Sequence, residues 1–155
     1  MTSVRRDRQS GQARHLGWSY GGYAALQAGV VDPGLFKAVV AIAPVTDFAL
    51  LKDESRNWSN HVLASRFIGS GAHIKDGSPA EHASSLRSPV LLVHGDLDRN
   101  VGIAQSRRMA DRLRSAGKKV ELVEFSKLDH YLEDSEARAT MLRKADAFLR
   151  SSLGL

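Results

Sequence analysis

Residues Gly17 to Gly22 read GWSYGG, a Gly-x-Ser-x-Gly pentapeptide followed by one more glycine. A serine in this motif sits on a sharp turn between a strand and a helix, where the backbone angles are strained for most residues. Gly17 and Gly21 are expected to remove side chains that would collide at such a turn. The same pentapeptide can also form an ordinary turn, so the flanking sequence decides whether Ser19 is a candidate nucleophile.

The sequence around the motif alternates between strand and helix patterns. Residues Ala13 to Trp18 predict a short strand, and Tyr20 to Val31 carry the small and apolar residues of a closely packed helix. Asp32-Pro33-Gly34 breaks that helix, and FKAVVAIA at Phe36 to Ala43 is typical of a strand buried on both faces. These segments predict a β-α-β unit with Ser19 at its first turn.

The rest of the chain continues the alternation. The later elements that the pattern predicts are one or two short helices over 50–68, a loop over 69–79, a buried strand over 90–94 (VLLVH), an amphipathic helix over 102–116, an edge-like strand over 120–125 (VELVEF) and a final helix over 134–153. Strands and helices that alternate in this way predict an α/β fold with a mostly parallel sheet of about four strands flanked by helices.

Composition limits the kind of protein and its chemistry. A chain of 155 residues that is 43% hydrophobic is long enough for one domain with a core. It contains no cysteine, so disulfides, thiolate metal sites and cysteine nucleophiles are excluded. The histidines show no metal-binding spacing such as HExxH, so we expect neither a metal site nor a cofactor.

Charge and hydropathy argue against nucleic-acid and membrane partners. Residues 1–14 hold four arginines against one aspartate, which accounts for +3 of the net charge of +5. We therefore expect residues 1–12 to form a basic, disordered leader rather than a nucleic-acid site. The longest apolar run, Ala38 to Val45, is too short to span a bilayer, and no secretory signal follows the arginines. A cytoplasmic location is expected, unless an upstream signal has been lost.

An acid and a base follow the two predicted strands after Ser19. The turn after 90–94 contains Asp96 and Asp98, and the turn after 120–125 ends in Asp129-His130. Because functional groups gather at the carboxyl ends of parallel strands, these side chains are expected to lie near the serine. The order serine, acid, histidine is that of the α/β-hydrolases. We predict a triad of Ser19, His130 and an acid from the turn after 90–94, either Asp98 or the competing Asp96, with Asp129 at the surface.

Each residue of this triad would have a distinct role. Ser19 is a poor nucleophile unless His130 takes its proton during attack and then passes it to the leaving group. A buried carboxylate at Asp98 would fix the tautomer of His130 and stabilise the imidazolium that forms.

Four segments together resemble the catalytic domain of the prolyl oligopeptidase family of serine peptidases. They are GWSYGGY, AIAPVTDF, PVLLVHGDLDRNV and the pair Asp129-His130, and the resemblance runs from about Gly17 to the C-terminus. Among its subgroups, the chain is most similar to acylaminoacyl-peptidase and dipeptidyl-peptidase types. In this family the acid occupies the position of Asp98.

The resemblance also implies a function and further site residues. It implies hydrolysis of peptide bonds in short peptides through an acyl-enzyme on Ser19, without a cofactor. Tyr20 would supply a backbone N–H to the oxyanion hole. The residues implied for the primary specificity pocket are Val45, Phe48, Asn100 and Val101. A carboxylesterase could use the same triad, so only the pocket separates these two activities.

The chain departs from the family at its beginning. Only 16 residues precede Gly17, whereas an α/β-hydrolase domain has several strands before its nucleophile, so residues 13–155 are expected to form the C-terminal half of the fold. A truncated chain would lack the second oxyanion donor and could be an inactive remnant that acts at most as an interaction module. The strand before Ser19 would then lie at an exposed sheet edge and invite self-association.

Overall fold

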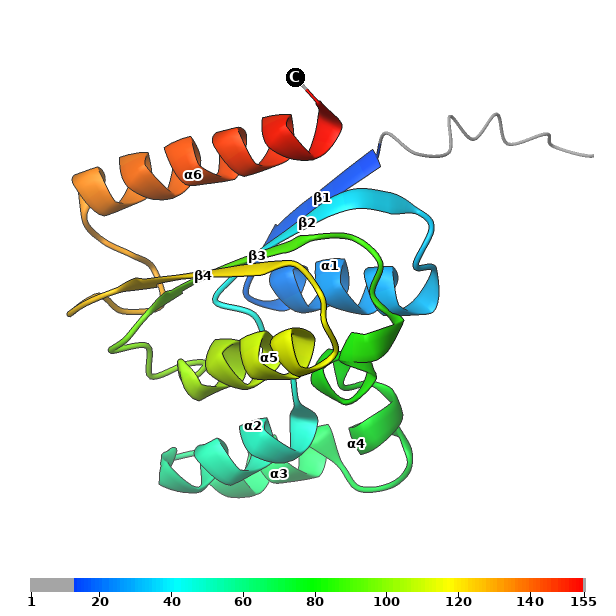
Figure 1. The fold of residues 1–155 in the computed structure, drawn as a ribbon. Helices are drawn as coiled ribbons and strands as arrows, with labels where there is room; N and C mark the ends of the chain where they lie inside the picture. Colours follow the sequence, from blue (N-terminus) through cyan, green and yellow to red (C-terminus); the bar gives the residue numbers. More distant parts are fainter. Residues whose placement is uncertain (1–12, 155) are drawn as a thin grey trace, which may run out of the picture.

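Four parallel strands form the centre of the structure, a computed structural model that describes residues 13–154 (Figure 1). The strands are β1 (Ala13–Trp18), β2 (Phe36–Ile42), β3 (Val90–Gly95) and β4 (Val120–Phe125). They lie in the order β1-β2-β3-β4, and each neighbouring pair is parallel. The predicted parallel sheet of four strands is confirmed, while the expected leader over 1–12 lies outside the described residues.

Helices cover both faces of the sheet. Figure 1 shows α1 (Tyr20–Val31) and α5 (Ala104–Ser115) on one face and α6 (Ser135–Leu153) alone on the other. The segment between β2 and β3 holds α2 (Phe48–Glu54), a 3-10 turn (Ser55–Asn57), α3 (His61–Ile68), α4 (His73–Asp76) and a second 3-10 segment (Pro79–Ser85). The loop predicted over 69–79 was therefore wrong in part. No helix within residues 13–154 is both long and apolar enough to cross a membrane.

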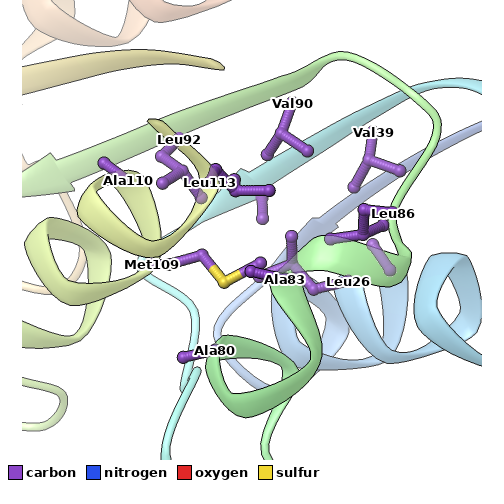
Figure 2. Packing of buried hydrophobic residues seen from close by; sticks show 12 residues of the cluster. Leu26, Val39, Ala80, Ala83, Leu86, Val90, Leu92, Met109, Ala110 and Leu113 are labelled. Atoms are coloured by element: carbon purple, nitrogen blue, oxygen red, sulfur yellow. The ribbon is translucent and has the colours of Figure 1, made fainter. Parts of the chain in front are cut away.

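The two central strands are buried on both faces because their side chains alternate between two hydrophobic clusters. On the α1 and α5 face, Val39, Val90 and Leu92 pack with residues of the helices, among them Leu26 and Met109 (Figure 2). On the α6 face, the intervening strand residues pack with side chains of that helix; this cluster includes Val40, Ile42, Leu91, Val93, Met141 and Ala145. The continuous apolar runs in the sequence reflect this burial on two sides.

Strand β1 lies at one edge of the sheet. Among the described residues it pairs with β2 alone, in register from Arg14 opposite Ala38 to Trp18 opposite Ile42. Its side chains are less buried than those of β2, and Leu16 is 48% exposed. Within residues 13–154, the strand that leads to Ser19 therefore has one backbone edge without a partner strand, as expected from the sequence.

Candidate active site

Ser19 lies on the turn between β1 and α1 with φ 55° and ψ −119°, a strained conformation for a residue with a side chain. Its backbone N–H donates to Ile42 O at 2.7 Å, which ties the turn to the end of β2. A Cβ at Gly17 would lie 2.0 Å from Gly21 O, so β1 and the start of α1 can approach this closely only when residue 17 is glycine.

Gly21, the second glycine of the pentapeptide, is not crowded in the same way. A Cβ at Gly21 would meet nothing within 4 Å beyond its chain neighbours and its own helix backbone, so the collision expected there was wrong. The next glycine, Gly22, is the crowded one, because a Cβ there would lie 3.0 Å from Pro44 Cβ and 3.1 Å from Ile42 O.

The turns after β3 and β4 bring Asp98 and His130 into contact. His130 Nδ1 donates to Asp98 Oδ2 at 2.6 Å, and both residues are buried. The other carboxylate oxygen, Oδ1, accepts from the backbone N–H groups of Asn100 at 2.8 Å and Val101 at 2.9 Å. These bonds fix the carboxylate on both sides and leave Nε2 of His130 as the ring nitrogen that can accept a proton.

The neighbouring acids have other partners. Asp96 Oδ1 accepts from the Lys127 backbone N–H at 2.6 Å, and the exposed Asp129 accepts from the Tyr131 backbone N–H at 3.0 Å. Neither carboxylate therefore competes with Asp98 for the His130 ring in this structure.

Burial raises the pKa of the Asp98 carboxyl, but the hydrogen bonds that it accepts outweigh burial, so the pKa lies below its usual value of 3.8. The donors, from the largest effect to the smallest, are the His94 side chain, the Val101 N–H, the His130 side chain and the Asn100 N–H. Asp98 is consequently ionised at neutral pH and can stabilise a positive charge on His130.

Several contacts position the segment that carries His130. A Cβ at Gly95 would lie 2.4 Å from Leu128 O, so this glycine allows the backbone before His130 to approach the end of β3. The indole Nε1 of Trp18 donates to His130 O at 3.1 Å. This bond links the serine turn to the segment that carries the histidine.

Ser19 and His130 line the same groove, which has a volume of about 600 Å³. Its other lining residues are Trp18, Asn100, Tyr131 and Arg138. Arg138 donates to Leu132 O and Tyr131 O, each at 3.0 Å. Within the part of the chain that the structure describes, the Ser19 hydroxyl has no hydrogen-bond partner.

A second, apolar pocket of about 430 Å³ also has Ser19 in its lining, together with Tyr20. It contains Val45 and Phe48, two of the residues expected at the specificity pocket. Sequence reasoning missed the remaining lining residues Tyr23, Leu51, Phe67, Ile68 and His73. They come from α1, α2, α3 and α4, and no local pattern indicates that these short helices meet there.

The other predicted site residues are placed as follows. Tyr20 is the first residue of α1, where backbone N–H groups have no partner within the helix. Asn100 lines the groove with Ser19, but Val101 lines neither this groove nor the apolar pocket. Val101 is 5% exposed, its N–H donates to Asp98 and its carbonyl oxygen lies 2.9 Å from His94 Nε2.

No arrangement of three or more histidine or acidic side chains suited to a metal ion occurs among residues 13–154. The side chains of Ser19, His130 and Asp98 offer a hydroxyl, an imidazole and a carboxylate.

The parallel sheet, with a serine at the turn after one strand and an acid and a histidine after later strands, places the molecule in the class of α/β-hydrolases. The comparison with protein families narrows this class. The chain belongs to the prolyl oligopeptidase family of serine peptidases, whose family model matches residues 9–155.

Individual relatives agree with this assignment. Prolyl endopeptidase FAP of Mus musculus is 27% identical over 146 residues, which cover 90% of this chain and 18% of that protein. The structure of a puromycin-hydrolyzing peptidase of Mycobacterium tuberculosis has a TM-score of 0.81 and 25% identity, covering 92% of this chain and 22% of that one.

Dipeptidyl peptidase 4 of Porphyromonas gingivalis has a TM-score of 0.76 and 26% identity, covering 89% of this chain and 19% of that one. The chain thus spans about a fifth of the length of these relatives.

Proposed function

We propose that this protein is a serine peptidase that cleaves short peptides through an acyl-enzyme on Ser19. The observation that carries the proposal is the 2.6 Å hydrogen bond from His130 Nδ1 to Asp98 Oδ2, made by a histidine that lines the same groove as Ser19. Because this bond occupies Nδ1, the Nε2 lone pair of His130 is available to act as a general base.

In the first half of the reaction, Ser19 Oγ attacks the carbonyl carbon of the scissile bond while His130 Nε2 takes the hydroxyl proton. The ionised Asp98 stabilises the imidazolium that results. The Tyr20 N–H at the start of α1 lies beside Ser19 and would donate to the oxyanion of the tetrahedral intermediate. The intermediate collapses when His130 returns the proton to the leaving amine, and Ser19 remains acylated.

In the second half, water replaces the amine. His130 takes one proton from the water as its oxygen attacks the ester carbonyl, and the proton then passes to Ser19 Oγ as the acid product leaves. The same three side chains therefore serve both halves, and the protein is restored to its starting state.

The apolar pocket beside Ser19 supports a substrate preference. With Val45, Phe48 and Tyr23 in its lining, it suits an apolar or aromatic side chain at the residue whose carbonyl is attacked. Asn100, exposed in the adjoining groove, would hydrogen-bond the peptide backbone. Short peptides are the substrates we favour, in keeping with the dipeptidyl peptidase and puromycin-hydrolyzing peptidase that this chain resembles.

Hydrolysis of acyl-peptide nitroanilides with phenylalanine before the anilide tests this proposal. We expect turnover by the wild type, its loss in Ser19→Ala, and a loss on the order of 10⁴ in rate in Asp98→Asn. Phe48→Ala should lower kcat/KM for this substrate, whereas Leu142→Ala, on the exposed side of α6, should not.

Two outcomes would overturn the proposal. Turnover of simple nitrophenyl esters without turnover of any anilide would make the protein a carboxylesterase. A folded wild type that hydrolyses neither substrate would leave the site without catalytic activity, and the chain would then act at most as an interaction module.

A further inference from the structure

A second histidine lies against the carboxylate of Asp98. His94, near the end of β3, is fully buried, and its Nε2 lies 3.2 Å from Asp98 Oδ2. The same nitrogen lies 2.9 Å from Val101 O, and Nδ1 lies 2.7 Å from the hydroxyl of Ser106 on α5. The His94 imidazole takes part in none of the proposed reaction steps.

The partners of His94 assign its protons. Nε2 faces a carbonyl oxygen and an ionised carboxylate, which can only accept, so Nε2 carries a hydrogen. The Ser106 hydroxyl can donate or accept, so it can pair with Nδ1 whether or not that nitrogen carries a hydrogen. Asp98 and Val101 therefore fix the N–H on Nε2.

We propose that His94 is a positioning residue, which holds the Asp98 turn so that Oδ2 faces His130. The turn is closed from two sides: the Val101 N–H donates to Asp98 Oδ1, and the Val101 carbonyl accepts from His94. Removal of His94 frees the carbonyl of this turn and removes the imidazole beside Oδ2. The effect of His94 on catalysis rests on the proposed function. Its effect on the Asp98 carboxylate can be measured without any substrate.

Other charged groups around His94 remain in place when it is replaced. Glu54 at the end of α2 and Glu124 on β4 both interact electrostatically with His94. Glu124 forms an ion pair with Arg107 of α5 at 2.7 Å, and His130 contacts the Oδ2 atom of Asp98. A comparison of two uncharged replacements at position 94 therefore leaves this surrounding charge constant.

The matched replacements are His94→Gln and His94→Leu. A glutamine amide can place an N–H close to the position of His Nε2, whereas leucine has similar bulk and no donor. The first measurement is the acid titration of the Asp98 carboxyl by ¹³C NMR, with Asp98→Asn to assign the resonance. We expect the Asp98 pKa to rise in His94→Leu and to stay close to the wild type in His94→Gln.

The second measurement is the rate at which a fluorophosphonate labels Ser19. We expect His94→Leu to react about tenfold to hundredfold more slowly, as for loss of a hydrogen bond to a charged group, and His94→Gln to regain most of the rate. If both His94 variants fail to fold, Ser106→Ala replaces them and should raise the Asp98 pKa, because it removes the hydrogen bond that holds the His94 ring against Asp98.

The outcomes separate the two proposals. Equal Asp98 titration in the wild type and the folded variants, or equal effects of glutamine and leucine, would overturn the role of His94. A wild type that is never labelled, with an Asp98 titration that still depends on the donor at position 94, would overturn the peptidase and leave the positioning role intact.

Discussion

At the scale of single residues, the serine turn depends on one glycine more than on the other. A side chain at Gly17 would run into the Gly21 backbone, with its Cβ 2.0 Å from the oxygen and 2.2 Å from the carbonyl carbon. Backbone atoms this deep in the turn cannot move aside as a flexible side chain would. Gly21, by contrast, has open space where its side chain would be, although both belong to the same pentapeptide.

The pair Gly17→Ala and Gly21→Ala tests this asymmetry. We expect Gly17→Ala to lower the free energy of unfolding by at least about 3 kcal/mol, because β1 and α1 must move apart. Gly21→Ala lies within the helix and should be neutral or stabilising by up to about 1 kcal/mol. Urea denaturation of both variants measures the difference, and equal losses would contradict it.

The resemblance to the prolyl oligopeptidase family, rather than any local pattern, predicts Asp98 instead of Asp96 as the acid, and His130 contacts Asp98 in the structure. In the Asp98 turn, Oδ1 accepts the N–H groups two and three residues further on, a pattern within four consecutive residues. The hydrogen bond from Trp18 to the His130 carbonyl could not be predicted, because it joins segments 112 residues apart whose meeting is set by the whole sheet.

At the scale of elements, α2 and α5 are joined by a buried amide. Gln105 of α5 is fully buried, and its Oε1 accepts from the backbone N–H groups of Thr46 and Asp47, each at 2.9 Å. The Thr46 hydroxyl in turn donates to Gln105 O at 2.7 Å. These bonds hold the residues that lead into α2, whose Phe48 and Leu51 line the apolar pocket.

Gln105→Met should therefore lower the free energy of unfolding by more than the similar size of the two side chains suggests. Two buried N–H groups would be left without an acceptor, so we expect a loss of about 3 kcal/mol in the free energy of unfolding. Gln27→Met is the matched control, because the Gln27 amide makes only a 3.4 Å bond to Asp76 O, and it should change stability by less than about 1 kcal/mol. Thermal or urea unfolding measures the stability of both variants, and similar losses in Gln105→Met and Gln27→Met would contradict this expectation.

Glu54, at the end of α2, gives the molecule a pH dependence of known sign. Burial raises the pKa of Glu54 above its ordinary 4.5, and the Gln105 amide only partly offsets this. The folded state therefore binds the Glu54 proton more tightly than the unfolded state, and stability falls as pH rises from 4.5 through the raised value.

Glu54→Gln should remove this contribution. We expect the variant to be more stable than the wild type at pH 7, with the difference shrinking below pH 4.5, where Glu54 is protonated in both states. Urea unfolding at several pH values measures it. A stability difference that does not change with pH would show that ionisation of Glu54 has no such cost.

Elements with a clear local signal could be predicted with their bounds, and the shortest ones could not. The helix over Tyr20–Val31, which ends at the Asp32-Pro33-Gly34 break, and the alternating strand over Val120–Phe125 match the structure at both ends. In contrast, α4 has only four residues, HIKD, without a periodic apolar face. Its place depends on tertiary contacts such as the hydrogen bond from the Phe48 N–H to the Ser78 hydroxyl, at 2.9 Å.

At the scale of the whole molecule, β1 has one edge without a partner strand among residues 13–154, and another chain could pair there. An exposed strand edge offers unpaired N–H and C=O groups to a partner strand, and charged side chains oppose such pairing. We expect the protein to self-associate through β1 as its concentration rises, and Leu16→Lys to weaken this association.

Sedimentation velocity over a range of concentrations measures the association. The control is Leu142→Lys, which places the same charge on the exposed face of α6, where Leu142 is 61% exposed. A wild type that stays monomeric at all concentrations, or an equal effect of both lysines, would show that β1 is not the contact.

We propose that Ser19, His130 and Asp98 act as one unit in a chain that spans about a fifth of the length of the three relatives compared with it. Intact-mass measurement after fluorophosphonate treatment tests it most directly. We predict a single adduct on Ser19, no adduct in Ser19→Ala, and labelling slowed by orders of magnitude in His130→Ala. A folded wild type that gains no adduct, or labelling of Ser19 that is as fast without His130, would contradict the claim.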